Sequence, residues 1–205
     1  MRTRKTEEVE FTRGQFARAS LKVFLEKGFF GATMEEISRA AGYSTTAIYK
    51  YFHAKDEVFH AALASISRDF LEILDESVPA SLDFRAFLTW KMTRALGKAD
   101  KDRDVFIGFM TQIAMGPWHT ATHENIREAH MEFMRRFEDY MRRGIAEGAL
   151  APGDPSIYAS ALDGLTHAFI ERWLFAGANY ALTDHVETII ELFLNGVGAR
   201  GGVAS

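Results

Sequence analysis

A short stretch of the chain, GYSTTAIYKYF at residues 42–52, gathers side chains that can bind phosphate groups and nucleobases. Ser44 and Thr45 bring hydroxyl groups, Lys50 brings an ammonium group and Tyr49 brings a phenol. Such groups donate hydrogen bonds to phosphate oxygens or base edges, and an aromatic ring can lie against a sugar-phosphate backbone. The stretch therefore predicts a surface that binds nucleic acid. The alternative is the solvated face of a small helical domain.

Two helices are expected to precede this stretch. The first runs from about residue 12 to 27, and Gly28 follows it at the position where helices commonly end. Thr33 and Glu36 have the spacing of a capping box, in which each side chain satisfies a backbone N–H of the other residue. A second, short helix is therefore predicted to begin at Thr33, and Gly42 is expected to end it.

A third helix is predicted to begin near Ser44. Ile48 and Phe52 are four residues apart and should face inward together. The hydroxyl, phenol and ammonium side chains of the stretch would then face outward. Two short helices joined by a turn that contains glycine form a helix-turn-helix, and a helix of this size fits the major groove of DNA.

Composition limits the remaining possibilities. The chain has 205 residues, of which 47% are hydrophobic and 25% charged, and this is typical of a globular protein. It has no cysteine, so disulfides and thiolate metal sites are excluded. We expect no membrane span and no secretory signal, which favours the cytoplasm. The net charge is −4, yet residues 1–60 hold ten Lys and Arg against eight Asp and Glu, a net of +2.

The rest of the chain also reads as helix, so the predicted fold class is all-α. The four prolines lie between periodic segments, and no stretch shows the alternation typical of a strand. We expect a helix-turn-helix domain over residues 1–54, with a basic N-terminal tail, and a larger helical domain over residues 55–205. The further helices are predicted at about 55–77, 84–98, 103–115, 123–147, 155–176 and 184–197.

The sequence over about residues 12–60 resembles the DNA-binding region of the TetR family of bacterial transcriptional regulators. The resemblance is carried by Phe24-x-x-x-Gly28, by Thr-x-x-acid-Ile from Thr33, by the Ala-Gly pair at Gly42, and by Ser-x-x-x-Ile-Tyr-x-x-Phe-x-x-Lys from Ser44. It implies a homodimer with an N-terminal three-helix DNA-binding domain and a larger helical domain that binds a small molecule and dimerises. Most members of the family are repressors that leave their operator when the ligand binds.

The same resemblance implies which positions contact DNA. Thr33 and Lys55 match positions that contact phosphate, and the others match the recognition helix and its end. Two departures are Thr46, where relatives often have Gly or Pro, and Ala54, where relatives often have a serine that caps the next helix. The implied contacts are Thr33, Ser44, Thr45, Thr46, Tyr49, Lys50, Tyr51 and Lys55.

The last two predicted helices favour a subunit interface. The final one carries a single apolar stripe, whereas the one before it is apolar on two faces and so needs cover on both. A second copy of the chain would supply that cover, and a deeply buried central helix is the alternative. The expected interface is Leu162, Leu165, Phe169, Trp173, Val186, Ile189, Ile190, Phe193, Leu194 and Val197.

A ligand site is expected among the middle helices, where large apolar side chains are frequent, although most of these could simply form the core. The candidates are Trp90, Phe106, Phe109, Met110, Ile113, Trp118, His130, Met134, Phe137 and His167. We expect no cofactor and no metal. His119 and His123 are spaced as metal ligands, but they lack the glutamate of an HExxH motif. The competing function is a helical enzyme that binds a small molecule or depends on a metal, with a structural N-terminal domain.

Overall fold

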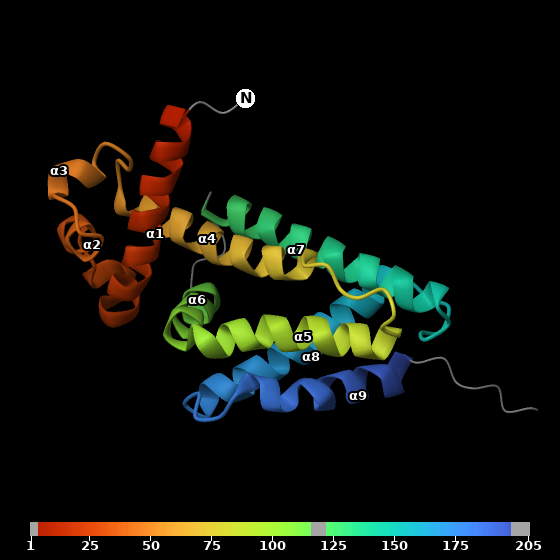
Figure 1. Cartoon of the computed structure of the whole chain (residues 1–205). Helices are drawn as coiled ribbons and strands as arrows, with labels where there is room; N and C mark the ends of the chain where they lie inside the picture. The colour runs from red at the N-terminus through yellow and green to blue at the C-terminus, as the bar shows by residue number, and fades with distance from the viewer. Residues whose placement is uncertain (1–3, 116–121, 198–205) are drawn as a thin grey trace, which may run out of the picture. The chain divides into compact units, whose positions relative to one another are not determined.

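The computed structural model describes residues 4–115 and 122–197, and it describes side chains over 8–110 and 127–196. All regular structure in these residues is helical, without a strand (Figure 1). The elements are α1 (Arg4–Gly31), α2 (Met34–Ala40), α3 (Thr45–Ile48), α4 (Lys55–Asp75), α5 (Phe84–Lys101), α6 (Arg103–Met115), α7 (Thr122–Ala146), α8 (Pro155–Phe175), the 3-10 helix η1 (Leu182–His185) and α9 (Val186–Val197). The predicted all-α fold is confirmed.

The described residues pack into two compact units. The first contains residues up to 69 together with those of 102–129, and the second contains residues 70–101 together with those from 130 onward. The helix α4 contributes to both units, since its first fifteen residues lie in one and its end in the other. These packing units are larger than the predicted DNA-binding domain of residues 1–54, which stays a prediction.

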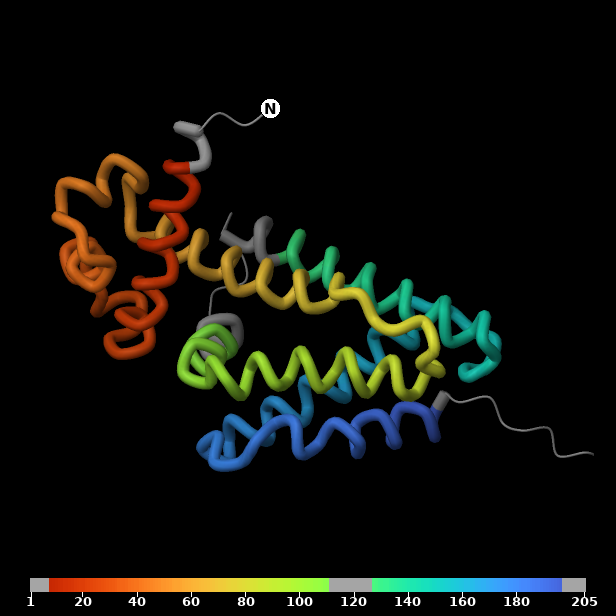
Figure 2. Tube along the Cα trace, viewed as in Figure 1, coloured from red at the N-terminus to blue at the C-terminus, as the bar shows by residue number. Residues whose placement is uncertain are grey.

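In the first unit, α1, α2 and α3 enclose a small apolar core, and α2 and α3 lie beside α1 in the trace (Figure 2). The core consists of Phe16, Val23, Phe24, Ala32, Ile37, Ile48, Phe52 and Val58. Rings of this core meet edge to face, as Phe16 and Phe52 do with centroids 6.3 Å apart. Burial of these side chains holds the short helices in place, because a four-residue or seven-residue helix is not stable by itself.

The boundaries of α1 differ from the prediction. The helix begins at Arg4 rather than near Thr12, although Phe11 in the additional turns is largely exposed. Acidic residues at positions 7, 8 and 10 suit the positive end of a helix, which favours the earlier start. The break at Gly28 agrees with the prediction, because this residue has φ +69° inside the segment that ends at Gly31.

In the second unit, α9 packs against α5 and α8, and it runs alongside α5 (Figure 1). Trp173 of α8 is fully buried, and its indole N–H donates to the carbonyl of Tyr180 at 2.8 Å. The carboxylate of Asp100, at the end of α5, accepts from the backbone N–H groups of Leu182 and Thr183 and so fixes the start of η1. None of the helices within the described residues is long and apolar enough to cross a membrane.

Candidate nucleic-acid interface

The first helix of the helix-turn-helix, α2, begins at a complete capping box. The hydroxyl Oγ1 of Thr33 accepts from the N–H of Glu36 at 3.2 Å and donates to its carboxylate at 3.0 Å. The N–H of Thr33 donates to the same carboxylate oxygen, Oε2, at 3.1 Å. The predicted capping box is therefore confirmed. The hydroxyl of Thr33 is already used as donor and acceptor, so contact of this oxygen with phosphate stays a prediction.

A negative charge stands at the start of α2. The other carboxylate oxygen of Glu36 accepts from the ammonium group of Lys27 at 2.5 Å. The hydrogen bonds from Lys27 and then from Thr33 lower the pKa of Glu36 from its ordinary value, so this side chain is ionised at neutral pH. An anion at this end of a helix is favourable, and here the chain itself provides it.

The turn between α2 and α3 is shaped by Gly42 and Tyr43. Gly42 has φ +78°, a conformation that favours glycine. The N–H of Tyr43 donates to the carbonyl of Ser38 at 2.9 Å, and its phenol donates to the side-chain oxygen of Gln15 at 2.5 Å. The ring of Tyr43 also packs on Phe16, with centroids 4.9 Å apart. This side chain therefore ties the turn to α1.

The recognition segment is a single helical turn, α3, backed by two buried residues. Ile48 and Phe52 are fully buried, as predicted. Ser44, Thr45, Thr46, Tyr49 and Lys50 are exposed, and half of the surface of Tyr49 is accessible. Ser44 occupies the N-cap position without making a side-chain cap bond, so its hydroxyl remains available. The expected outward face is confirmed as a surface, and its contact with DNA stays a prediction.

Tyr51 is placed differently from the other predicted contacts. It is half-buried, and its ring lies 5.8 Å from that of Phe16. Its carbonyl accepts from the guanidinium of Arg13, which also lies over the ring of Phe52 at 4.2 Å. Part of the Tyr51 side chain is therefore buried against α1. Arg13 was not among the residues predicted from the sequence, and its only signal there is its position one turn before Phe16.

Lys55 is the second residue whose surroundings differ from the expectation. Its ammonium group donates to the carbonyls of Ala32 at 2.8 Å and Phe30 at 3.3 Å, and it lies over the ring of Phe29 at 4.7 Å. A cation at the start of α4 is unfavourable by itself, and these carbonyls at the end of α1 stabilise it within the chain. A phosphate contact by Lys55 would use its remaining N–H and stays a prediction.

The start of α4 lacks a serine cap, as expected from Ala54 at that position. A carboxylate instead accepts a hydrogen bond from a backbone N–H near this helix end. Oε2 of Glu57 accepts from the N–H of His53 at 2.9 Å. The N-terminal end of α4 is also acidic, with Asp56 and Glu57 in its first turn. A weakened start of this helix is therefore offset in part by Glu57.

The described residues define a class of protein: an all-α chain whose N-terminal helices form a helix-turn-helix with a polar recognition face, as in DNA-binding transcriptional regulators. The comparisons with known proteins agree. Residues 17–62 match the family model described as bacterial regulatory proteins, tetR family. The N-terminal region of the chain is therefore similar to the DNA-binding region of TetR-family transcriptional regulators.

Relatives extend over most of the chain. It is 23% identical over 199 residues to the HTH-type transcriptional regulator HbdR of Aromatoleum sp. (strain CIB), an alignment that covers 93% of this chain and 84% of HbdR. The fold is similar to that of the regulator FadR of Bacillus subtilis in complex with stearoyl-CoA, with a TM-score of 0.79 and 19% identity over 89% of this chain and 98% of FadR.

A further solved structure is SmeT, the repressor of the multidrug efflux pump SmeDEF of Stenotrophomonas maltophilia. It has a TM-score of 0.73 and 21% identity over 92% of this chain and 91% of SmeT. These relatives are regulators of transcription and not enzymes, which agrees with the expectation that this chain is not an enzyme.

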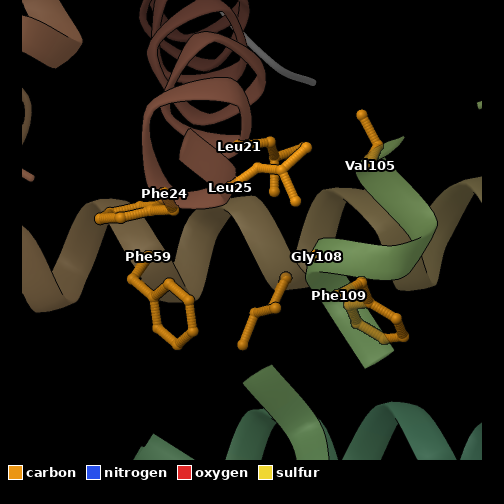
Figure 3. A pocket seen from close by; sticks show the side chains of 8 residues that line it. Leu21, Phe24, Leu25, Phe59, Val105, Gly108 and Phe109 are labelled. Atoms are coloured by element: carbon orange, nitrogen blue, oxygen red, sulfur yellow. The ribbon is translucent and has the colours of Figure 1, made fainter. Parts of the chain in front are cut away.

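The predicted ligand residues fall into both units. Phe106, Phe109 and Met110 belong to the first unit, and Phe109 lines a cavity of about 20 Å³ there, between Leu21 and Leu25 of α1 and the turn of α6 that contains Gly108 (Figure 3). This volume suits about one water molecule and is far below the several hundred Å³ of a ligand site. The side chain of Ile113 and the whole of Trp118 lie outside the described residues, as do the side chains of His119 and His123.

The other predicted ligand residues belong to the second unit. Phe137 is buried, Met134 is half-buried, and Trp90 lines an open groove of about 650 Å³ along α5. His130 and His167, the two histidines among the candidates, are both exposed. His167 bonds to Asp163 on its own helix, with Nδ1 3.0 Å from the backbone oxygen. The two histidines thus face solvent, and the ligand set stays a prediction.

The predicted dimer interface requires a correction. Six of its residues are buried within a single copy of the chain, so they cannot offer a surface to a second copy: Leu162, Trp173, Val186, Ile189, Ile190 and Phe193. Leu165, Phe169 and Leu194 are half-buried, and the side chain of Val197 lies outside the described residues. The apolar stripe of α9 is covered by α5 and α8, which explains the difference.

Proposed function

We propose that this chain is a ligand-responsive transcriptional repressor that acts as a homodimer in the cytoplasm, binds a palindromic operator and leaves it when a small, largely hydrophobic effector binds. One observation supports the proposal most strongly. The exposed face from Ser44 to Lys50 is held outward by the fully buried Ile48 and Phe52, inside the region that matches the TetR family. Two such faces related by a twofold axis would read two half-sites about one DNA turn apart.

Lys50 provides the sharpest test of DNA contact. It is exposed, and its side chain makes no ion pair or hydrogen bond with the described residues, so Lys50→Ala should leave the fold unchanged. If Lys50 neutralises a phosphate, the slope of log K against log salt should become shallower in this variant by about 0.9 for each such phosphate. An operator selected from random duplexes would serve as the probe, with affinity measured by gel shift at several salt concentrations.

Arg85→Ala is the matched control, because it removes the same charge from α5 in the second unit, where the guanidinium pairs with Glu187 and Glu191. This variant should keep the wild-type slope. Equal slopes for the wild type and Lys50→Ala would refute the phosphate contact. Failure to select any duplex would refute the proposed function.

The effector class is inferred from the fold. FadR, whose fold is similar, was solved with stearoyl-CoA, a molecule with a long apolar chain. We therefore propose stearoyl-CoA as the first probe of release, with free coenzyme A and stearate as comparisons. Release by stearate and stearoyl-CoA but not by coenzyme A would support a hydrophobic effector. If none of the three weakens operator binding, this effector class is wrong.

The proposed dimer surface is the exposed face of α8. Ala161, Gly164 and Ala168 are exposed and lie on one face of this helix, and Ile157 and Phe175 extend that face toward its two ends. Phe175 is 91% exposed, which is unfavourable unless a partner covers it. Small residues allow a second helix to approach closely, so this face suits a symmetric helix pair.

Gly164→Arg tests this surface, because the new side chain would stand in the helix contact. A Cβ at Gly164 meets no atom of the same chain within 4 Å, so the fold of the single chain should tolerate the change. Met131→Arg, at an exposed site on α7, is the control. Sedimentation should show monomers for Gly164→Arg and dimers for the control, and two indistinguishable dimers would place the interface elsewhere.

A further inference from the structure

A buried lysine holds the C-terminal end of α4. Lys91 of α5 is 4% exposed, and its ammonium group donates to the carbonyl of Leu74 at 2.5 Å and to that of Glu76 at 2.6 Å. The last carbonyls of a helix have no partner within the helix, and a cation suits their negative end. Burial lowers the pKa of Lys91 from its ordinary value, while the negative charges of Glu76 and Asp75 oppose this.

Tyr140 of α7 joins Lys91 at the same carbonyl. Its phenol donates to the carbonyl of Leu74 at 2.6 Å and is buried, and burial raises its pKa well above the ordinary value, so it remains a donor. The rings of Trp90, Tyr140 and Phe87 lie 5.3, 5.6 and 6.0 Å from the ammonium group. Aromatic faces at these distances attract a cation and keep water away from it.

Two arginines hold the carboxylates on either side. Arg136 of α7 binds both oxygens of Asp75, each at 3.1 Å. Arg94 of α5 binds both oxygens of Glu76, at 2.9 and 2.7 Å. Such bidentate pairs fix direction as well as distance. We call Lys91, Arg94, Arg136 and Tyr140 the α4 clamp, since all four bind residues 74–76.

The clamp lies within the second unit, but the helix that it holds begins in the first. Lys55 and Val58 belong to the first unit, and Val58 packs in the core of the helix-turn-helix. A buried ammonium group is costly, and a methionine would fill the same space without that cost. Methionine could not donate hydrogen bonds to the two carbonyls. The advantage of Lys91 over methionine is therefore that it fixes the position of the end of α4.

We propose that the α4 clamp fixes the direction in which α4 leaves the second unit, and that it thereby sets the spacing of the two operator half-sites that the dimer accepts. This inference rests on the proposed function. Inserting one base pair between half-sites moves one of them by about 3.4 Å and turns it by about 34°. A dimer in which the end of α4 is fixed in each subunit cannot easily adjust to this change in half-site spacing. A dimer in which the ends of α4 are free to move can adjust to it.

The experiment compares operators with the selected spacing against operators with one base pair inserted or removed. The wild type should strongly prefer the selected spacing. Lys91→Met removes both ammonium hydrogen bonds at similar volume, and its preference should fall by about fivefold or more. Arg85→Met is the matched control, because it also removes a cation from α5 but one that pairs with α9. It should keep the wild-type preference.

Tyr140→Phe gives a second, milder variant that keeps the ring and loses only the hydrogen bond to Leu74. It should show a smaller loss of preference, and it decides the question if Lys91→Met does not fold, which circular dichroism would reveal. Folded variants that discriminate between the spacings as strongly as the wild type would overturn the clamp proposal alone. A wild type that binds no palindrome would refute the proposed function instead.

Discussion

Replacing Thr33 by valine tests how α2, the first helix of the helix-turn-helix, begins. Valine has nearly the shape of threonine but removes the hydroxyl, so the bond from the N–H of Glu36 and the bond to its carboxylate are lost. The bond from the N–H of Thr33 to Glu36 remains. The loss of an N-cap side chain costs about 1 kcal/mol, and the hydroxyl–carboxylate bond adds little because it is exposed. We therefore expect α2 to be less stable by about 1 kcal/mol.

Hydrogen exchange measures this cost locally. A loss of about 1 kcal/mol corresponds to exchange that is roughly fivefold faster for amides that open with α2. The reporter is the N–H of Ala41, which donates to Ile37 at 3.0 Å, and the N–H of Leu150 in the second unit is the internal reference. Thr33→Ser keeps the oxygen and should exchange like the wild type. Equal rates for the serine and valine variants would show that the hydroxyl of Thr33 does not cap α2.

Three further predictions concern the second unit. Gly144→Ala should lower the free energy of unfolding by about 1–3 kcal/mol in urea titrations, because a Cβ there would lie 2.6 Å from Cζ of the buried Phe84; an unchanged midpoint would contradict this. Phe193→Ala should cost about 3–5 kcal/mol even in a monomeric background, because the ring is buried within one chain; a loss of stability seen only in dimers would instead favour the interface predicted from the sequence. The hydrogen bond to Asp163 raises the pKa of His167, so this pair stabilises the fold below the unfolded pKa of about 6.5, and the stabilisation is lost as the pH rises through the raised folded pKa. The advantage of the wild type over His167→Gln should therefore be about 0.5 kcal/mol at pH 5.5 and near zero at pH 8.5, given the exposure of the pair, and a constant difference would refute it.

Local patterns in the sequence predicted the helix-turn-helix well. The capping box depends on two residues three positions apart, and the inward pair Ile48 and Phe52 depends on helical spacing. Both are properties of a few neighbouring residues, so no knowledge of the tertiary structure was needed. The start of α1 was missed because its first turns bury little and show no apolar stripe.

Contacts between distant segments could not be predicted in the same way. The carbonyl partners of Lys55 lie 23 and 25 residues away, and the partners of Lys91 lie 15 and 17 residues away. A lysine in the sequence carries no sign that it will be buried against a helix end. The phosphate contact expected of Lys55 was implied by the resemblance to the TetR family, and the structure gives its ammonium group carbonyl partners within the chain.

The apolar stripe of α9 illustrates a second limit. Ile189, Ile190 and Phe193 have the spacing of a buried face, which the structure confirms. The pattern indicates that a face is covered, but it does not distinguish cover by the same chain from cover by a second copy. The exposed face of α8 is formed largely by alanine and glycine, and residues of this size give a weak hydrophobic signal.

The number of basic residues near the N-terminus overstates the charge available to DNA. Lys27 and Arg39 are each paired with a carboxylate of the chain itself, which offsets their charge. Arg13 and Lys55 are bound to backbone carbonyls, so they keep their charge but have fewer N–H groups to donate. Attraction to DNA of arbitrary sequence depends on free cations, so a chain that occupies its own arginines and lysines lowers its affinity for the very large excess of unrelated genomic sites. Lower affinity for unrelated sites would leave more molecules free to find the few correct operators in a cell.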